Sequence, residues 1–286
     1  MLSAIINRLS LSEVSKEQIL GLLSKIQVLE RTGRYKKLLE SLEKSNDQAN
    51  FIAAVLEATI AYQFESAEIC LQHEERQDDT QKSSIDFHWK TKFGKDIYIE
   101  VRLCQQDDET RKSIAEQLNK HNMYKVTINE DSEKQNITRI QGVIRDKIAK
   151  KDGTLNKFHK CDSNIINIVA IDATRTIWGR FDLDDCRLVA FGDSAVTEVR
   201  QRQIDGIFQQ PKQEDTPDVK KHLQQFHEAR IRLHGIIFLF KIPSKEPLNY
   251  IIGQYPLWNP ALMQVSTSID ICNEIEAALP LVNFVG

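Results

Sequence analysis

Residues 164–175, which read NIINIVAIDATR, form a near-continuous apolar run. A strand with one face in the core alternates apolar and polar side chains, whereas an unbroken apolar run is typical of a strand covered on both faces. Helices that pack against both faces of a sheet provide such cover in α/β proteins. The run therefore predicts a central strand of an α/β sheet.

The segments around this run support that fold class. Before it come an apolar helix at 51–64, strand candidates at 67–75, 83–93 and 96–104, and a helix at 137–151. The polar connection at 105–136 is expected to hold a short helix around 112–121. After the run come a helical piece at 218–233, strands at 235–242 and 249–255, and a helix at 268–279. The order helix, three strands, helix, strand predicts an α/β fold with a mixed sheet.

Residues 1–46 predict a helical extension that precedes this core. Ser15 and Gln18 form a capping-box pattern, apolar residues follow at helical spacing over 19–29, and a second helix covers RYKKLLESLEK at 34–44. The polar residues at 45–47 then interrupt the helical pattern.

Composition limits the classes of function. The chain has 286 residues, 41% of them hydrophobic, and a net charge of −3, so a nucleic acid would have to be bound by a local basic patch. Its five scattered cysteines never form C-x-x-C, which argues against a disulfide framework or a zinc site and favours a reducing cytoplasm. We expect no signal peptide, because the apolar part of MLSAIINRLSLSE is too short, and no membrane span, because the densest apolar run, at 235–240, is far too short.

The stretch IYIEVRL at 97–103 carries two charges within an otherwise apolar strand pattern. Side chains alternate between the faces of a strand, so Glu100 and Arg102 share one face and the apolar residues share the other. The preceding strand divides in the same way. Its apolar face is expected to hold Ile85, Phe87 and Trp89.

These two strands are expected to pair as an antiparallel hairpin. For both apolar faces to lie on one side of the sheet, the residue numbers of two paired residues must add up to an even number, as for Ile85 opposite Leu103. This parity excludes a simple two-residue turn and predicts a three- or five-residue loop, or a bulge. Asp86 then lies close to Glu100, on the same face.

Two neighbouring carboxylates repel each other unless a cation lies between them or one is protonated. Mg²⁺, or Mn²⁺ in its place, suits such oxygen ligands, polarises a phosphodiester and lowers the pKa of its bound water. Asp86 and Glu100 are therefore the expected metal ligands. Arg102 points to the same face, where a cation would stabilise the charge that develops on phosphorus.

At these residues the sequence resembles the PD-(D/E)xK nuclease superfamily, which has the restriction-endonuclease-like fold. Glu57 in AVLEATIAY matches the acidic residue of the first helix in that family. Asp86 in SSIDF matches the aspartate of the PD element, and Glu100 in IYIEVRL matches the acidic residue of ExK.

The resemblance covers about residues 50–175, the length of that family's αβββαβ core. It implies a domain at 47–286 in which residues 176–286 elaborate the core. It also implies a Mg²⁺-dependent endodeoxyribonuclease, of the kind that serves in restriction or phage defence, and it allows a homodimer.

Two positions depart from the family pattern. Ile85 stands where proline is usual, and Arg102 stands where the ExK lysine belongs. Arginine cannot reproduce a compact ammonium whose pKa shifts near a nucleophilic water. Some family members carry the lysine on the following helix, where Lys147 and Lys151 lie four residues apart. Lys151 is preferred, because KKDGTL resembles the family's Lys-x-x-Gln-Leu-like segment with Thr154 in place of Gln.

The segment 139–160 is a candidate DNA-binding region, since it holds seven Lys or Arg against two Asp. Other signals are assigned no chemistry. DLDD at 182–185 lacks the glycine and glutamate of a calcium loop and is interpreted as loop or helix-cap residues.

Two hypotheses follow. The first is the endonuclease, with Glu57, Asp86, Glu100, and Arg102 or Lys151 as site residues. The second is a degenerate nuclease-fold scaffold for DNA binding or protein assembly, as the missing ExK lysine suggests. Convergence of the acids with a lysine amine would favour the enzyme, whereas an Arg102 salt bridge that fills the site would favour the scaffold.

Overall fold

The computed structural model describes residues 16–45, 47–79, 82–104, 112–113, 116–117, 120, 130–150, 152–174, 181–197, 203–243 and 250–282. The helices are α2 (Lys16–Thr32), α3 (Lys36–Lys44), α4 (Gln48–Ser66), α6 (Glu130–Ile148), α7 (Leu183–Phe191), α8 (Pro217–Gln224), α9 (His227–Arg232) and α10 (Val265–Glu276). The strands are β1 (Gln72–Glu75), β2 (Ile85–Lys90), β3 (Asp96–Leu103), β4 (Ile165–Asp172), β5 (Gly235–Pro243) and β6 (Tyr250–Trp258). The chain is an α/β protein.

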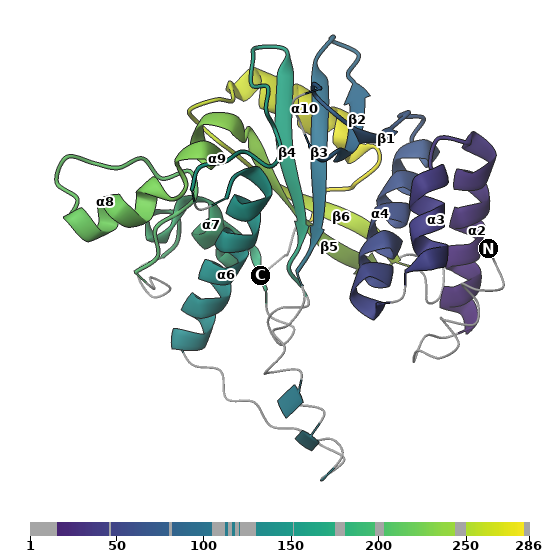
Figure 1. Cartoon of the computed structure of the whole chain (residues 1–286), viewed down its shortest axis with the longest axis horizontal. Helices are drawn as coiled ribbons and strands as arrows, with labels where there is room; N and C mark the ends of the chain where they lie inside the picture. The colour runs from purple at the N-terminus through teal and green to yellow at the C-terminus, as the bar shows by residue number, and fades with distance from the viewer. Residues whose placement is uncertain are drawn as a thin grey trace.

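Six strands form one mixed sheet in the order β1-β2-β3-β4-β5-β6 (Figure 1). β1, β2 and β3 pair antiparallel, β3, β4 and β5 pair parallel, and β5 and β6 pair antiparallel. Each parallel connection needs a crossover, which α6 provides between β3 and β4. From α4 to β4 the order is helix, three strands, helix, strand, as predicted.

Helices cover both faces of the sheet (Figure 1). On one face, α2, α3, α4 and α10 share a hydrophobic cluster with the sheet. On the other face, α6, α7 and α9 share a second cluster with it. β4 lies between the two and is buried at every position, which is why its sequence is an unbroken apolar run. The predicted helical extension therefore packs into the same core as α4.

The hairpin of β2 and β3 has the predicted parity. Phe87 pairs with Ile99 and Lys90 pairs with Asp96, so residues 91–95 form a five-residue loop. Gly94 has φ +84° in this loop, a conformation that favours glycine. The register is shifted by two residues from the example of Ile85 opposite Leu103, because the residue numbers of each pair add up to 186 rather than 188.

One predicted face of β2 is wrong at its first residue. Phe87 and Trp89 pack on the α4 side of the sheet as expected, but Ile85 packs on the α6 side. Pairing of β2 with β3 ends at Phe87, and before that point β2 is paired only with β1, where Glu75 lies opposite Ile85. Asp86 directly follows Ile85, so this change of face affects the direction of the Asp86 side chain.

Several element bounds also differ from the predictions. β1 is shorter than the predicted strand at 67–75, and α6 begins earlier than expected and ends at Ile148. The helix expected around 112–121 falls mostly outside the described residues. α7 was not predicted as a helix, although the predicted helix-cap role of DLDD is confirmed: Asp182 and Asp185 form a capping box at its start. No helix in the described ranges is long and apolar enough to cross a membrane.

Candidate functional site

Glu100 is the most buried acidic residue near the hairpin. It lies on β3 with none of its surface exposed, and its side chain projects toward the α6 face because its neighbours Ile99 and Val101 pack on the α4 face. An ionised carboxylate is costly to bury unless it is paired. The partners of Glu100 therefore define the site.

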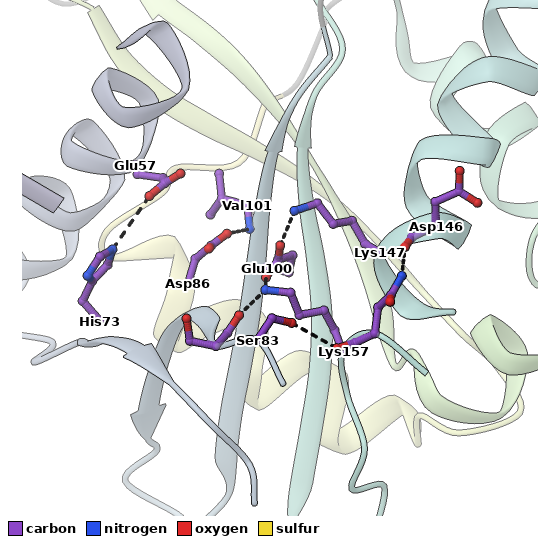
Figure 2. A network of polar contacts seen from close by, with 11 residues as sticks. Glu57, His73, Ser83, Asp86, Glu100, Val101, Asp146, Lys147 and Lys157 are labelled. Atoms are coloured by element: carbon purple, nitrogen blue, oxygen red, sulfur yellow. Dashed lines mark hydrogen bonds and ion pairs between the residues drawn. The ribbon is translucent and has the colours of Figure 1, made fainter. Parts of the chain in front are cut away.

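The first partner of Glu100 is Lys147, near the end of α6. Its amine donates a hydrogen bond to Oε1 of Glu100 (Figure 2). The isoleucines of the helix, including Ile144 and Ile148, are fully buried against the sheet, and this packing fixes the height of Lys147 above β3. A helix-borne amine thus lies beside the acidic residue of the strand.

The second partner is Lys157, in the segment that follows α6. Its amine lies 3.0 Å from Oε2 of Glu100 and donates a hydrogen bond to the backbone carbonyl of Ser84 (Figure 2). The contact with Oε2 lacks hydrogen-bond geometry, so this buried oxygen has an ionic neighbour but no hydrogen-bond donor. Glu100 therefore meets two ammonium groups, one at each oxygen.

Asp86 lies on the other side of β3 from the two lysines in Figure 2. Oδ2 of Asp86 accepts a hydrogen bond of 2.7 Å from the backbone N–H of Val101. Strand N–H groups point toward the neighbouring strand, so the carboxylate takes the place of a β2 carbonyl just beyond the Phe87–Ile99 pair. Asp86 is thus beside Glu100, as predicted, but it lies between the strands rather than squarely on the Glu100 face.

Burial raises the pKa of the Asp86 carboxyl well above its usual range, and the charges of Glu100 and Glu57 raise it further. Lys147 and the Val101 N–H act in the opposite direction. The two acids that raise this pKa come from different layers, since Glu57 lies on α4 and Glu100 faces α6. Asp86 is the point at which the three predicted acids meet.

Glu57 is held at the edge of this site by a histidine. Its Oε2 lies 3.8 Å from Nε2 of His73 on β1, whose side chain is almost wholly buried (Figure 2). The His73 ring lies against Phe87 and Tyr35, with ring centroids 5.5 and 6.4 Å away. Glu57 therefore has a fixed neighbour although part of its own surface is exposed.

The two cations predicted for the site have different outcomes. Arg102 is exposed on β3, and among the described residues it forms no ion pair with Asp86 or Glu100. The salt bridge that would have filled the site is therefore not present there. Lys151 lies outside the described residues. Lys147, the alternative lysine of the sequence analysis, lies on α6 and contacts Glu100.

Sequence reasoning missed Lys157 and His73. Lys157 was one of the seven basic residues of the segment 139–160, but no spacing in the sequence marks it as a neighbour of Glu100. Its position depends on a turn after α6, where the Asn156 side chain donates to the carbonyl of Asp146. His73 carries no motif, and only the pairing of β1 with β2 brings it to Glu57.

Half of the described cations in the predicted basic segment 139–160 are committed to internal contacts. Lys147 and Lys157 face Glu100, and Arg145 binds Asp146 and Gln225. Its remaining described cations are Arg139, Lys150 and Lys160. The segment offers fewer charges to a nucleic acid than its composition suggests.

Asp86 and Glu100 fit a hard divalent cation only in part. No group of three or more His, Cys, Asp or Glu side chains in the described ranges is arranged to hold a metal ion. Mg²⁺ usually keeps several waters and binds through one or two carboxylates, so a pair of acids is sufficient. The buried Oε2 of Glu100, which has no hydrogen-bond donor, is the atom that supports such a site.

Comparisons of the chain with protein-family models, with curated proteins and with solved structures found no match.

Proposed function

We propose that this protein is a Mg²⁺-dependent endodeoxyribonuclease with a divergent PD-(D/E)xK site. The contact between Lys147 and Glu100, beside Asp86 and Glu57, is the observation that carries the proposal. It supplies an amine, from the helix that follows β3, in place of the lysine that the strand lacks. The order of elements from α4 to β4 also agrees with the αβββαβ core of that superfamily.

Each side chain has a distinct role in this proposal. Asp86 and Glu100 would hold the cation, which would supply polarisation of the phosphodiester and a lower pKa for a bound water. Lys147 holds that water by a hydrogen bond and stabilises negative charge on the phosphoryl oxygens. Glu57 adds negative charge on the α4 side of Asp86, and so favours a cation there.

The surface beyond Glu100 is suited to phosphate. Arg102 follows two residues later on β3, and Arg139 on α6 lies near enough to act with it on the same thiol, that of Cys104. Burial raises the pKa of this thiol to about 12, and the charges of Arg139 and Arg102 oppose the rise. Nη2 of Arg139 is buried without a hydrogen-bond acceptor, and a surface hollow beside it is lined by Lys134, Gln135 and Thr138.

A second candidate function is a nuclease-fold scaffold without turnover. The two ammonium contacts of Glu100 favour it, because lysines that neutralise a buried carboxylate can hold a fold together without any cation. In that case the site is an ion-pair network that fastens α6 to β3. The two proposals differ in whether a divalent cation binds.

Incubation of supercoiled plasmid with the protein and Mg²⁺ or Mn²⁺ tests both proposals. The endonuclease should produce nicked and linear DNA, and Glu100→Gln should abolish the products. Glu30→Gln, an exposed change on α2, is the matched control and should cleave like the wild type. Absence of cleavage with either ion, together with a melting temperature that does not respond to the ion, would reject the enzyme, since a ligand of the folded state raises its stability.

A further inference from the structure

The two oxygens that surround the amine of Lys157 are of the kind that bind hard cations. One is Oε2 of Glu100, at 3.0 Å, and the other is the backbone carbonyl of Ser84, which accepts a hydrogen bond from the amine. Carboxylate and carbonyl oxygens are preferred ligands of hard divalent ions.

The hydrogen-bond pattern shows that the lysine satisfies this position incompletely. Oε1 of Glu100 accepts a hydrogen bond from Lys147, but Oε2 has none, although it is fully buried. A buried acceptor without a donor costs free energy that a better-placed cation would recover. Any metal that binds Glu100 through its free oxygen must therefore take the place where the Lys157 amine lies.

Hydrogen bonds fix the backbone next to Lys157, whereas the Lys157 side chain is partly exposed to solvent. The preceding residue, Asn156, donates its N–H to Ile148 at 2.8 Å and its side-chain amide to Asp146 at 2.7 Å. The backbone carbonyl of Asn156 accepts a hydrogen bond of 3.2 Å from Ser83 Oγ. The Lys157 side chain itself is 12% exposed, so the amine can leave toward solvent on its flexible stem without moving this turn.

We propose that Lys157 is a tethered cation that holds the place of a divalent ion. Its ammonium occupies the position between Glu100 Oε2 and the Ser84 carbonyl, and it leaves both oxygens when the ion binds. Lys147 stays on Oε1 throughout. This proposal rests on the metal site proposed above and adds the Ser84 carbonyl to its ligands.

Chemical labelling of lysines tests the displacement directly. The full-length protein is acetylated briefly with and without MgCl₂, and the modified lysines are quantified by peptide mass spectrometry. Acetylation of Lys157 should rise several-fold with Mg²⁺, because a released amine meets the reagent, whereas Lys147 should keep its rate. Equal or lower labelling of Lys157 in Mg²⁺ would overturn the proposal.

Removal of the tethered cation gives an independent measurement. In Lys157→Met, Mg²⁺ affinity measured by calorimetry should increase about tenfold, because the ion no longer competes with the amine. Lys160→Met removes an exposed charge from the same segment and should change this affinity much less. Weaker or unchanged Mg²⁺ binding in Lys157→Met would show that Lys157 supports the site instead.

These measurements also separate this proposal from the function on which it rests. If the wild type binds Mg²⁺ and cleaves plasmid while Lys157 labelling does not change, only the displacement is wrong. If Mg²⁺ neither binds nor changes the labelling, the metal site and the displacement are both wrong.

Discussion

Lys147 on α6 donates its hydrogen bond to Oε1 of Glu100 on β3, so the helix supplies an amine at the strand's acidic residue. Arg102, at the position of the ExK lysine, is exposed two residues further along β3. The cation that the strand carries, Arg102, and the amine that contacts Glu100, Lys147, are therefore different side chains. They can be tested by separate substitutions.

Lys147→Met should lower the rate of plasmid cleavage by about 10²–10⁴, the usual range for a group that handles a proton or positions a nucleophile. Binding of Mg²⁺ should be retained, because Asp86 and Glu100 remain. Cleavage is measured under single-turnover conditions, and urea unfolding checks that the variant is folded. Lys150→Met, an exposed change just after α6, is the matched control.

The opposite pattern would support Lys151, the lysine that the sequence favoured. If Lys147→Met cleaves normally and Lys151→Ala is inactive, then Lys151 supplies the amine and the contact of Lys147 with Glu100 is structural.

If the protein is the proposed endonuclease, Arg102→Ala should weaken binding to a DNA duplex at all sequences alike, because a cation that contacts phosphates carries no sequence information. The slope of log binding constant against log salt should become shallower by about one. Fluorescence anisotropy at several salt concentrations measures both quantities. Arg102→Lys should keep most of the affinity and should not raise the cleavage rate, because Lys147 already supplies the amine.

Lys90→Ala, at the far end of β2, is the control for Arg102→Ala and should leave the salt dependence unchanged. An Arg102→Ala variant that binds DNA as the wild type does but no longer cleaves it would make Arg102 the working cation of the site.

Periodicity in the sequence was sufficient to predict the pairing of β2 with β3 and the closeness of Asp86 to Glu100. Both depend on the alternation of side chains along a strand, which is a local property. The change of face at Ile85 was not predictable in this way, because it occurs where β2 leaves its pairing with β3. The sequence pattern does not show where a strand pair ends.

The lysines of the site depend on tertiary contacts. Lys157 reaches Glu100 because the segment after α6 is fastened to the sheet, for instance through Gln77, which donates to Asn167 Oδ1 at 2.6 Å and accepts from the Lys160 N–H at 2.9 Å. These residues are far apart in the chain and carry no recognisable spacing. The sequence therefore predicted the carboxylates of the site but not the side chains that join distant segments.

His234 should contribute to acid sensitivity. Its Nδ1 accepts the backbone N–H of Asn167, and burial lowers its pKa to about 4. The unfolded chain, with a histidine pKa of about 6.5, binds more protons between these values, so the free energy of unfolding falls as pH decreases through this window. The loss should reach roughly 2 kcal/mol at pH 5 relative to pH 7.

His234→Asn keeps an acceptor for the Asn167 N–H and removes the titrating ring. Urea unfolding between pH 7 and pH 5 should therefore show a flatter acid limb for this variant than for the wild type. His227→Asn, an exposed change at the start of α9, should leave the pH dependence below pH 7 as it is. A variant at position 234 with the wild-type slope would assign the acid sensitivity to other groups.

Asp86 should have the opposite effect to His234 on the pH dependence of the free energy of unfolding, because the pKa of Asp86 is raised in the folded protein. Above the usual carboxyl pKa of about 4, the folded state holds this proton and the unfolded chain does not. The free energy of unfolding of the metal-free protein must then fall as pH rises toward the folded pKa. Asp86→Asn keeps an acceptor for the Val101 N–H, so it should stabilise the metal-free protein at neutral pH and flatten this decline.

In the wild type, Mg²⁺ should reverse this fall of the free energy of unfolding with rising pH. A cation that needs the ionised carboxylate binds more tightly as pH rises. Its stabilising effect should increase with pH in the wild type and be nearly absent in Asp86→Asn. Urea unfolding with and without Mg²⁺ between pH 5 and pH 8 measures both effects, with the exposed Asp79→Asn as the control. Equal slopes for wild type and Asp86→Asn, in either condition, would show that Asp86 is ionised in the folded protein and does not couple the cation to a proton.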